Sequence, residues 1–216
     1  MATLSGVGVV DKTVAVLRAL ERIGPAGLAE VQVEAGLPRA TAHRLLRALE
    51  HHGLVRRDQQ GRFCPGLGLI SLGRAAADAF PLAELSRPAL HRLRDRTGES
   101  VQLFVREGDG RRCVVSLQSA HGLRWIVPEG AVLPLQVGSA GRILSGETGP
   151  DGWVQSVEER EPGVASVSAP VVDGHGDVVA AISISGPLGR LTRQPGGRFG
   201  VDVEAAGLEV SAALAG

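Results

Sequence analysis

The chain has 216 residues, of which 44% are hydrophobic and 21% are charged, and its 23 basic and 23 acidic side chains give a formal net charge of zero. This length builds one large domain or two modest domains with ordinary buried cores, and the composition is that of a globular rather than a disordered chain. No apolar run approaches the ~20 residues of a membrane-spanning helix, and the first residues lack the basic and apolar parts of a secretion signal, so we expect a soluble protein of the cytoplasm.

Positive charge is distributed unevenly along the chain. Residues 1–80 carry ten basic against seven acidic side chains, whereas residues 81–216 carry thirteen against sixteen. Between residues 39 and 62, six arginines are accompanied by only two acidic residues. Three histidines lie in the same stretch: His43, His51 and His52. A neutral chain can still bind a polyanion if its positive charge is gathered on one surface, so this stretch is a candidate for contact with nucleic acid.

Three short helices are predicted in the first part of the chain. The first has Asp11 as its N-cap and is stopped by a Gly-Pro pair, with apolar residues at helical spacing in between. The second covers residues 28–35 and is expected to end at Gly36, because the residue after a helix often adopts the left-handed conformation that glycine favours. The third opens at residue 38 or 39 and is closed by Gly53.

A small hairpin is predicted directly after the third helix. The stretches "LVRRD", "QQG" and "RFC" are expected to form a strand, a turn and a strand. Two short helices joined by a tight glycine-containing turn and followed by a hairpin make a winged helix-turn-helix. Residues 1–65 are therefore assigned to a DNA-binding domain of this type.

The third helix has an apolar face and a basic face. At about 100° per residue its apolar side chains gather on one side: Ala42, Leu45, Leu46 and Leu49. In helix-turn-helix proteins the first residues of this helix meet base edges in the major groove, and flanking residues contact phosphates. The expected base or backbone contacts are Arg39, Thr41, His43 and Arg44, and the expected phosphate contact is Arg47. The wing residues expected to reach the neighbouring backbone or minor groove are Arg56, Arg57 and Arg62. A merely solvated basic face is the alternative.

An α+β domain is predicted after a connecting helix. The stretch "GLGLISLGRAAADAF", residues 66–80, is expected to form a helix that Pro81 breaks, linking the domains and contributing to dimer contacts. Further helices are predicted over residues 82–96 and 201–214. Five strands are predicted between them: "SVQLFVRE", "RCVVSLQS", "LRWIVPE", "ASVSAPVVD" and "DVVAAISISG". The stretch "DGHGD" is a turn signal between the last two.

Five stretches of the chain together carry a family resemblance. They are "VDKTVAVLRAL", "GLPRATAHRLLRALEHHGLVRRD", "GLRWIVPEGAVLPLQVGSAGRIL", "EEREPGVASVSAPV" and "AAISISGP". In this order, over nearly the whole chain, they closely resemble the IclR-type transcriptional regulators. The resemblance implies a winged helix-turn-helix joined by a linker helix to a GAF-like antiparallel sheet domain, residues 81–216, that binds a small molecule. It also implies a homodimer or dimer of dimers on partly palindromic operator DNA, most often as a repressor and sometimes as an activator.

The second domain carries two features that suit a small-molecule pocket. The small residues 138–141 stand where a helix begins, so free N–H groups there could cradle a carboxylate, or the helix could simply pack closely on a sheet. Ser183 and Ser185 lie two apart on a predicted strand and face the same side, either as a pocket wall or as hydroxyls bonded to nearby backbone. The effector-binding positions that the resemblance implies are Ser139, Ala140, Ser166, Ser183 and Ser185.

Departures from the family pattern bear on the same pocket. Ser166 stands where many relatives carry cysteine, and Ser156 stands where an acidic residue is usual. Residues 146–160 form a short segment where relatives add several turns of helix, so the effector domain is shortened and its wall on this side is thinner or more open. Arg124 and Arg142 could neutralise an acidic ligand, although surface positions suit both better.

No catalytic constellation is expected. Cys64 and Cys113 are too few for a disulfide framework and are expected to be buried or half-buried hydrophobic residues, and thiol-based chemistry needs paired cysteines. The chain has no G-x-S-x-G stretch, and its histidines lack metal-ligand spacing, so no metal or cofactor is expected. The expected function is a DNA-binding regulator, more often a repressor, whose operator affinity a small organic or aromatic acid modulates. The alternative is a constitutive DNA-binding regulator whose second domain is an oligomerisation or protein-interaction platform without a ligand.

Overall fold

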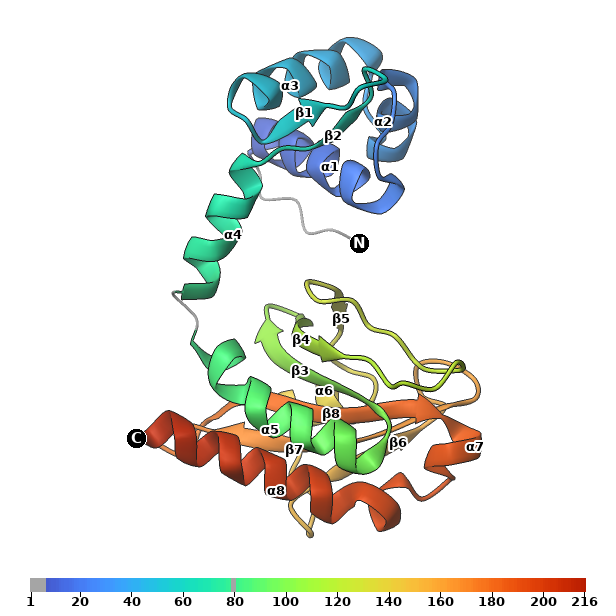
Figure 1. Ribbon diagram of the computed structural model, residues 1–216, viewed down its shortest axis with the longest axis vertical. Coiled ribbons are helices and arrows are strands. Elements are labelled where there is room, and N and C mark those ends of the chain that lie inside the picture. The colour runs from blue at the N-terminus through green and yellow to red at the C-terminus, as the bar shows by residue number, and fades with distance from the viewer. Residues whose placement is uncertain (1–6, 79–80) are drawn as a thin grey trace. The chain divides into compact units, whose positions relative to one another are not determined.

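The computed structural model describes residues 7–78 and 81–216 (Figure 1). The chain divides into two compact units, residues 1–80 and 81–216. The first unit is mainly helical with a small hairpin, and the second is a sheet with helices on both faces. Among the described residues, no helix combines the length and the hydropathy that crossing a membrane requires.

Three helices build the core of the first unit: α1 (Gly8–Ile23), α2 (Leu28–Ala35) and α3 (Arg39–His51). The bounds predicted for α2 are confirmed, and Gly36 follows it in the left-handed conformation, with φ of 64°. The predicted start of α1 was wrong, because the helix begins at Gly8 and Asp11 lies in its first turn rather than at the N-cap. Solvent can satisfy the first N–H groups of a helix without a side-chain cap, and a carboxylate in the first turn still favours the helix dipole.

A two-stranded hairpin completes the winged helix-turn-helix. Its strands β1 (Val55–Arg57) and β2 (Phe63–Pro65) pair antiparallel. The Asp58 carboxylate closes the turn by accepting hydrogen bonds of 3.0 and 2.9 Å from two backbone N–H groups of the turn. Phe63 is buried against the helices, and its backbone exchanges hydrogen bonds of 2.9 and 2.8 Å with Ala26. The predicted winged helix-turn-helix is confirmed.

A further helix, α4 (Gly68–Asp78), follows the hairpin. It occupies most of the helix predicted over residues 66–80, of which residues 79 and 80 lie outside the described part of the chain. Ile70 and Leu72 on α4 are more than half exposed, at 55% and 60%.

The second unit contains one antiparallel sheet of six strands in the order β5-β4-β3-β8-β7-β6. The strands are β3 (Ser100–Glu107), β4 (Gly110–Leu117), β5 (Val132–Pro134), β6 (Val154–Val157), β7 (Val164–Val172) and β8 (Val178–Pro187). The predictions for β3, β4, β7 and β8 are confirmed, and the "DGHGD" stretch joins β7 to β8 as predicted. The α+β class and the antiparallel sheet are thus as the sequence indicates.

The strand predicted over residues 123–129 was wrong, and β6 was not predicted. Residues 118–131 contain no strand, and the edge strand β5 begins only at Val132. Val127 is instead buried in a cluster with Phe104 of β3 and with Ile143. Val127 and the partly buried Trp125 therefore pack over the sheet with their side chains, and the segment does not pair along its edge.

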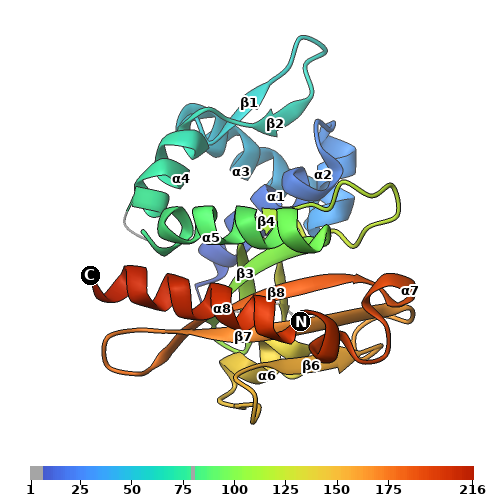
Figure 2. The same cartoon turned by 60° about the horizontal axis from the view of Figure 1, so that its bottom comes forward.

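Four helices accompany the sheet: α5 (Leu82–Thr97), α6 (Ser139–Leu144), α7 (Leu188–Leu191) and α8 (Pro195–Ala215). Figures 1 and 2 show α5 and α8 side by side across one face, with α6 on the opposite face. The closing helix begins at Pro195, earlier than the predicted residue 201, because proline is favoured in the first turn of a helix.

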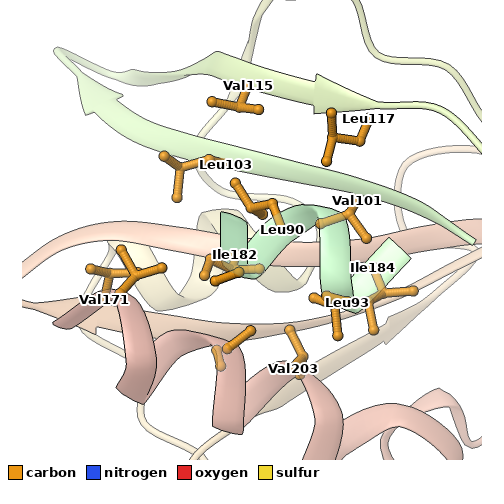
Figure 3. Packing of buried hydrophobic residues seen from close by; sticks show 14 of the residues in the cluster. Leu90, Leu93, Val101, Leu103, Val115, Leu117, Val171, Ile182, Ile184 and Val203 are labelled. Atoms are coloured by element: carbon orange, nitrogen blue, oxygen red, sulfur yellow. The ribbon is translucent and has the colours of Figure 1, made fainter. Parts of the chain in front are cut away.

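Side chains alternate strictly along the central strands. The face under α5 and α8 carries valine, leucine and isoleucine, and Figure 3 shows Ile182 and Ile184 of β8 beside Leu90 and Leu93 of α5 and Val203 of α8. The opposite face of the same strands carries serines, such as Ser183 between the two isoleucines. One face is therefore an apolar core, and the other, which we call the polar face, carries these serines beside a smaller apolar cluster around α6 and is also covered.

A bulge in β4 changes which face its residues meet. Leu103 pairs with Val115, but the next residue, Phe104, pairs with Cys113, so one residue of β4 is left over. Val115 accordingly belongs to the core under α5 and α8, whereas Cys113 belongs to the cluster around α6. Before the bulge, the β4 side chains in the same alternating set as Cys113 therefore point to the polar face.

Glycines in the first turns of α8 admit the Trp153 ring. A Cβ atom at Gly196 or Gly200 would overlap the indole, whereas one at Gly197 would meet nothing within 4 Å in the described residues. The three glycines lie within five consecutive positions of one helix. They form a matched set for testing this contact.

We expect Gly200→Ala to lower the free energy of unfolding of the second unit by about 1–3 kcal/mol, because the added methyl group forces the indole aside. Urea unfolding followed by tryptophan fluorescence measures this unit alone, since both tryptophans, Trp125 and Trp153, lie in it. Gly197→Ala is the control, with an expected gain of about 0.5–1 kcal/mol from helix propensity. Equal stabilities of the two variants would contradict the packing.

Candidate functional site

The two faces of α3 differ as predicted. Its buried residues are Ala42, Leu46 and Leu49. Its exposed residues include Ala40, His43, Arg44, Arg47 and His51. Leu45 is partly buried against the same core, and Thr41 is half-buried in the first turn. The apolar stripe holds the helix in the unit, so the basic side chains on the other side extend into solvent.

Two wing arginines are engaged within the fold. The Arg57 guanidinium lies 4.1 Å from the centre of the Phe63 ring and donates to the Glu50 carboxylate on α3 at 3.1 Å. Arg62 donates to the Asp58 carboxylate at 2.8 Å. These contacts attach the hairpin to the end of α3 and fix its turn.

The remaining basic residues are more available. Arg47 lies 3.7 Å from the Glu50 carboxylate, with its side chain 65% exposed. The exposed side chains of Arg39, Arg44 and Arg56 form no ion pair or hydrogen bond with any residue that the structure describes. The structure therefore separates the predicted arginines into a set that stabilises the wing and a set free for an external anion.

The polar face of the second unit is a cluster of paired hydroxyls. Ser166 of β7 lies opposite Ser185 of β8, and Ser168 lies opposite Ser183. The Ser139 hydroxyl at the start of α6 is within 2.7 Å of the hydroxyls of both Ser166 and Ser168. These hydrogen bonds hold α6 on the sheet.

A small cavity lies on this polar face, with a volume of about 40 Å³. Its walls come from β3, β4, β6, β7, β8, the start of α6 and the segments around residues 125 and 160. Four predicted effector positions line it: Ala140, Ser166, Ser183 and Ser185. Ser156 lines it as well, whereas Ser139 does not and bonds to the two serines of β7.

The small residues at the start of α6 serve close packing. A Cβ atom at Gly141 would overlap the Leu135 carbonyl and the Arg111 guanidinium. The N–H group of Gly138 donates to the Glu159 carboxylate at 2.9 Å. Glu159 of the chain itself therefore supplies the carboxylate at Gly138, the N-cap of this helix, where the sequence had suggested a ligand carboxylate.

Arg124 and Arg142 are absent from the cavity walls. Arg142 donates to Glu147 at 2.5 and 2.7 Å and to Glu159 at 3.0 Å, and these carboxylates raise the pKa of its guanidinium. Arg124 donates to the Gln118 side chain at 3.0 Å. Both residues hold local structure.

Two other arginines line the cavity and were missed by the sequence analysis. Arg111 of β4 is 3% exposed, and half-buried Arg160 precedes β7. Burial and the nearby charge of Arg160 lower the pKa of Arg111 to about 10. Arg111 occupies the same alternating set of strand positions as the buried residues Cys113 and Val115, and this was the only sequence pattern that could have indicated its burial. The bulge that turns Arg111 towards the cavity cannot be recognised from the sequence.

The exposed basic face of a winged helix-turn-helix defines the chain as a DNA-binding regulator of transcription. An IclR helix-turn-helix domain model matches residues 9–59, and the model of the bacterial transcriptional regulator IclR C-terminal domain matches residues 74–151 and 146–212. The chain therefore belongs to the IclR family of bacterial transcriptional regulators. The second match divides at residues 146–151, inside the segment that the resemblance marks as short.

Individual relatives agree with this assignment. The chain is 26% identical over 258 residues to the transcriptional repressor IclR of Escherichia coli K12, covering 100% of this chain and 94% of the relative. It is 28% identical over 224 residues to the HTH-type transcriptional repressor AllR of Salmonella typhi, covering 87% and 82%.

Solved structures share the fold. An IclR homologue from Microbacterium hydrocarbonoxydans, complexed with 4-hydroxybenzoate, matches with a TM-score of 0.80 at 20% identity, over 95% of this chain and 98% of that chain. An IclR transcriptional regulator from Alicyclobacillus acidocaldarius matches with a TM-score of 0.77 at 24% identity, over 96% and 98%.

Both cysteines are buried, as predicted. Burial, together with the charge of Glu129, raises the pKa of the Cys113 thiol from 9.0 to about 12. The unfolded chain ionises this thiol at lower pH, so its ionisation reduces the free energy of unfolding as the pH rises above 9.0.

We expect Cys113 to react with a disulfide reagent at pH 8 about 100-fold more slowly in the folded chain than in denaturant, because the thiol is buried and un-ionised. The Cys64→Ser variant leaves Cys113 as the only cysteine of the sequence. The serine hydroxyl can replace the Cys64 thiol as hydrogen-bond donor to the Arg56 carbonyl. Rapid labelling of the folded protein would show that Cys113 is accessible and would contradict the buried position.

Proposed function

We propose that the chain is a transcriptional repressor whose affinity for operator DNA changes when a small organic acid binds in the second unit. The observation that carries the proposal is the outer face of α3, where Arg44 extends from a helix whose apolar face packs into the core of the first unit. The curated relatives quoted above are both named repressors, which supports this sign of regulation.

The proposed DNA contacts follow the division among the basic residues. Base or backbone contacts are assigned to Arg39, Thr41, His43 and Arg44, and a phosphate contact to Arg47. Arg56 is proposed to reach the neighbouring backbone or minor groove directly. Arg57 and Arg62 are proposed to do so only while keeping the contacts that hold the wing.

Assembly is proposed to be a homodimer or a dimer of dimers, acting in the cytoplasm on two half-sites. Exposed Ile70 and Leu72 support a role for the 66–80 linker helix in dimer contacts, because large apolar side chains on a helix favour burial against a partner. Two-fold pairing of recognition helices matches operators with two-fold symmetry.

The effector is proposed to bind in the cavity of the second unit, residues 81–216. The proposed contacts are Ser139, Ala140, Ser166, Ser183 and Ser185. The 4-hydroxybenzoate bound by the Microbacterium homologue supports an organic acid as the ligand class. An effector alters DNA affinity only if it binds one dimer arrangement more tightly than the other, and we propose that the linker helix carries this coupling.

A constitutive regulator with a ligand-free second unit is the alternative. The cavity volume of about 40 Å³ favours it, because this space holds only a few water molecules. Thermal protection of the second unit by small acids supports the sensor. Absence of protection across a broad metabolite panel supports an oligomerisation platform.

We expect Arg44→Ala to weaken specific DNA binding about 10- to 100-fold, because a side chain that contacts a base edge contributes about 1–3 kcal/mol of discrimination. Fluorescence anisotropy with DNA from upstream of the gene for this protein measures the loss, with a scrambled duplex as competitor at two salt concentrations.

Arg18→Ala is the matched control, because it also removes one positive charge from the first unit but lies on α1 and pairs with Glu21. It is expected to change affinity less than about three-fold. Equal affinity of Arg44→Ala and the unmodified chain would contradict the assignment of α3. Absence of binding to either duplex at low salt would contradict DNA binding itself.

We expect Ser183→Ala and Ser185→Ala to shift the effector concentration for half-maximal response by about ten-fold, because each hydroxyl lines the cavity. DNA affinity without effector stays unchanged, since neither residue belongs to the first unit. The measurement is operator anisotropy titrated with an acid selected by thermal shift, with 4-hydroxybenzoate in the panel. Unaltered dose-response curves for both variants would remove them from the pocket.

A further inference from the structure

Arg111 is a buried cation without an anionic partner. Its side chain lines the cavity and is 3% exposed. One terminal nitrogen donates to the backbone carbonyls of Pro134 and Val137, the latter at 2.7 Å. Its Nε–H group is buried with no hydrogen-bond partner, and no carboxylate among the described residues forms an ion pair with it. Buried guanidinium groups are normally neutralised, so this one is incomplete.

The nearby carboxylates do not supply the missing charge. Glu159 attracts Arg111 but is already held by the Gly138 N–H group at 2.9 Å and by Arg142 at 3.0 Å. Glu161 is exposed at the edge of the cavity. The interior of the cavity therefore carries excess positive charge.

Arg160, which also lines the cavity, adds to this excess. Its guanidinium lies 4.9 Å from the centre of the Trp125 ring, and that of Arg111 lies 5.3 Å from the centre of the Phe104 ring. The two cations are close enough for Arg160 to disfavour the charge on Arg111. An anion between them would relieve this repulsion while the aromatic rings exclude water.

A second unsatisfied group lines the same cavity. Gln102 is 0% exposed, and its side-chain oxygen accepts a hydrogen bond of 2.8 Å from Ser185. Its amide nitrogen Nε2 has no partner in the described chain. A buried amide donor without an acceptor is costly, so a ligand that accepts a hydrogen bond here is favoured.

We propose that Arg111 binds the anionic group of the effector, with Arg160 closing on the same group and Gln102 donating to an acceptor elsewhere on the ligand. This inference rests on the proposed function and names the charge that its effector must carry. The ligand class is a small molecule with one oxyanion, a short flat apolar body against Phe104 and Trp125, and a hydrogen-bond acceptor. Because the cavity is only about 40 Å³, the half-buried Arg160 side chain has to swing aside to admit such a ligand before it closes on the anionic group.

The test uses benzoate and benzamide, two probes of the same shape that differ in charge. The full chain is titrated with each by calorimetry and by fluorescence, since Trp125 lines the cavity. Benzoate is expected to bind at least ten-fold more tightly than benzamide. Inorganic phosphate is the third probe. If phosphate competes with benzoate, the site accepts other oxyanions as well as carboxylates.

Arg111→Gln is expected to weaken benzoate about 10- to 100-fold while leaving benzamide unchanged, and Arg111→Lys is expected to restore part of the loss. The control is Arg112→Gln, which removes a neighbouring charge of the same strand that pairs with Glu107 outside the cavity. Arg160→Gln, in a more exposed turn, gives a second variant if Arg111→Gln fails to fold.

Three results would overturn the inference: equal binding of benzoate and benzamide, unchanged benzoate affinity in both the Arg111 and Arg160 variants, or no binding of benzoate or phosphate in the millimolar range. Operator anisotropy in the same samples separates the two proposals. If specific DNA binding is retained and responds to a neutral ligand, the assignment as a DNA-binding regulator stands and the anion site is rejected. Loss of specific DNA binding in every sample would instead reject the proposed function.

Discussion

The strict alternation of side chains along β7 and β8 is the constraint on which the second unit depends. Because successive residues point to opposite faces, a strand that reads Ile-Ser-Ile-Ser must place its isoleucines and its serines on different sides of the sheet. The isoleucine side joins α5 and α8 in a dry core. The serine side must still be covered, and small hydroxyl side chains allow α6 to approach and leave room for a polar cavity.

The fold could be predicted where local chemistry and long-range packing agree. Gly36 adopts the left-handed conformation that the end of α2 requires, and the leucines of α3 supply one unbroken apolar stripe. Prediction failed where tertiary contacts decide. Residues 123–129 have the apolar content of a strand, yet they form none, because Val127 and Trp125 pack instead in the cluster with Ile143 of α6.

The candidate site was only partly accessible to sequence reasoning for a related reason. The resemblance led to four positions that line the cavity: Ala140 of α6, Ser166 of β7, and Ser183 and Ser185 of β8. Arg111 was not found, because its direction depends on a bulge at Val114, and the pairing that creates the bulge involves another strand. Buried polar atoms left without partners, such as Gln102 Nε2, become visible only once three-dimensional packing is known.

The contact of Arg57 with Phe63 and Glu50 ties the wing to the end of α3. A hairpin this short would otherwise bend freely about its ends, since isolated two-stranded hairpins are only marginally stable. Where helix and wing both meet a duplex, as proposed above, this tie fixes the distance between their contact points. Discrimination among DNA sequences would then include how readily each duplex adjusts its groove width to that span, a form of readout that needs no contact with a base.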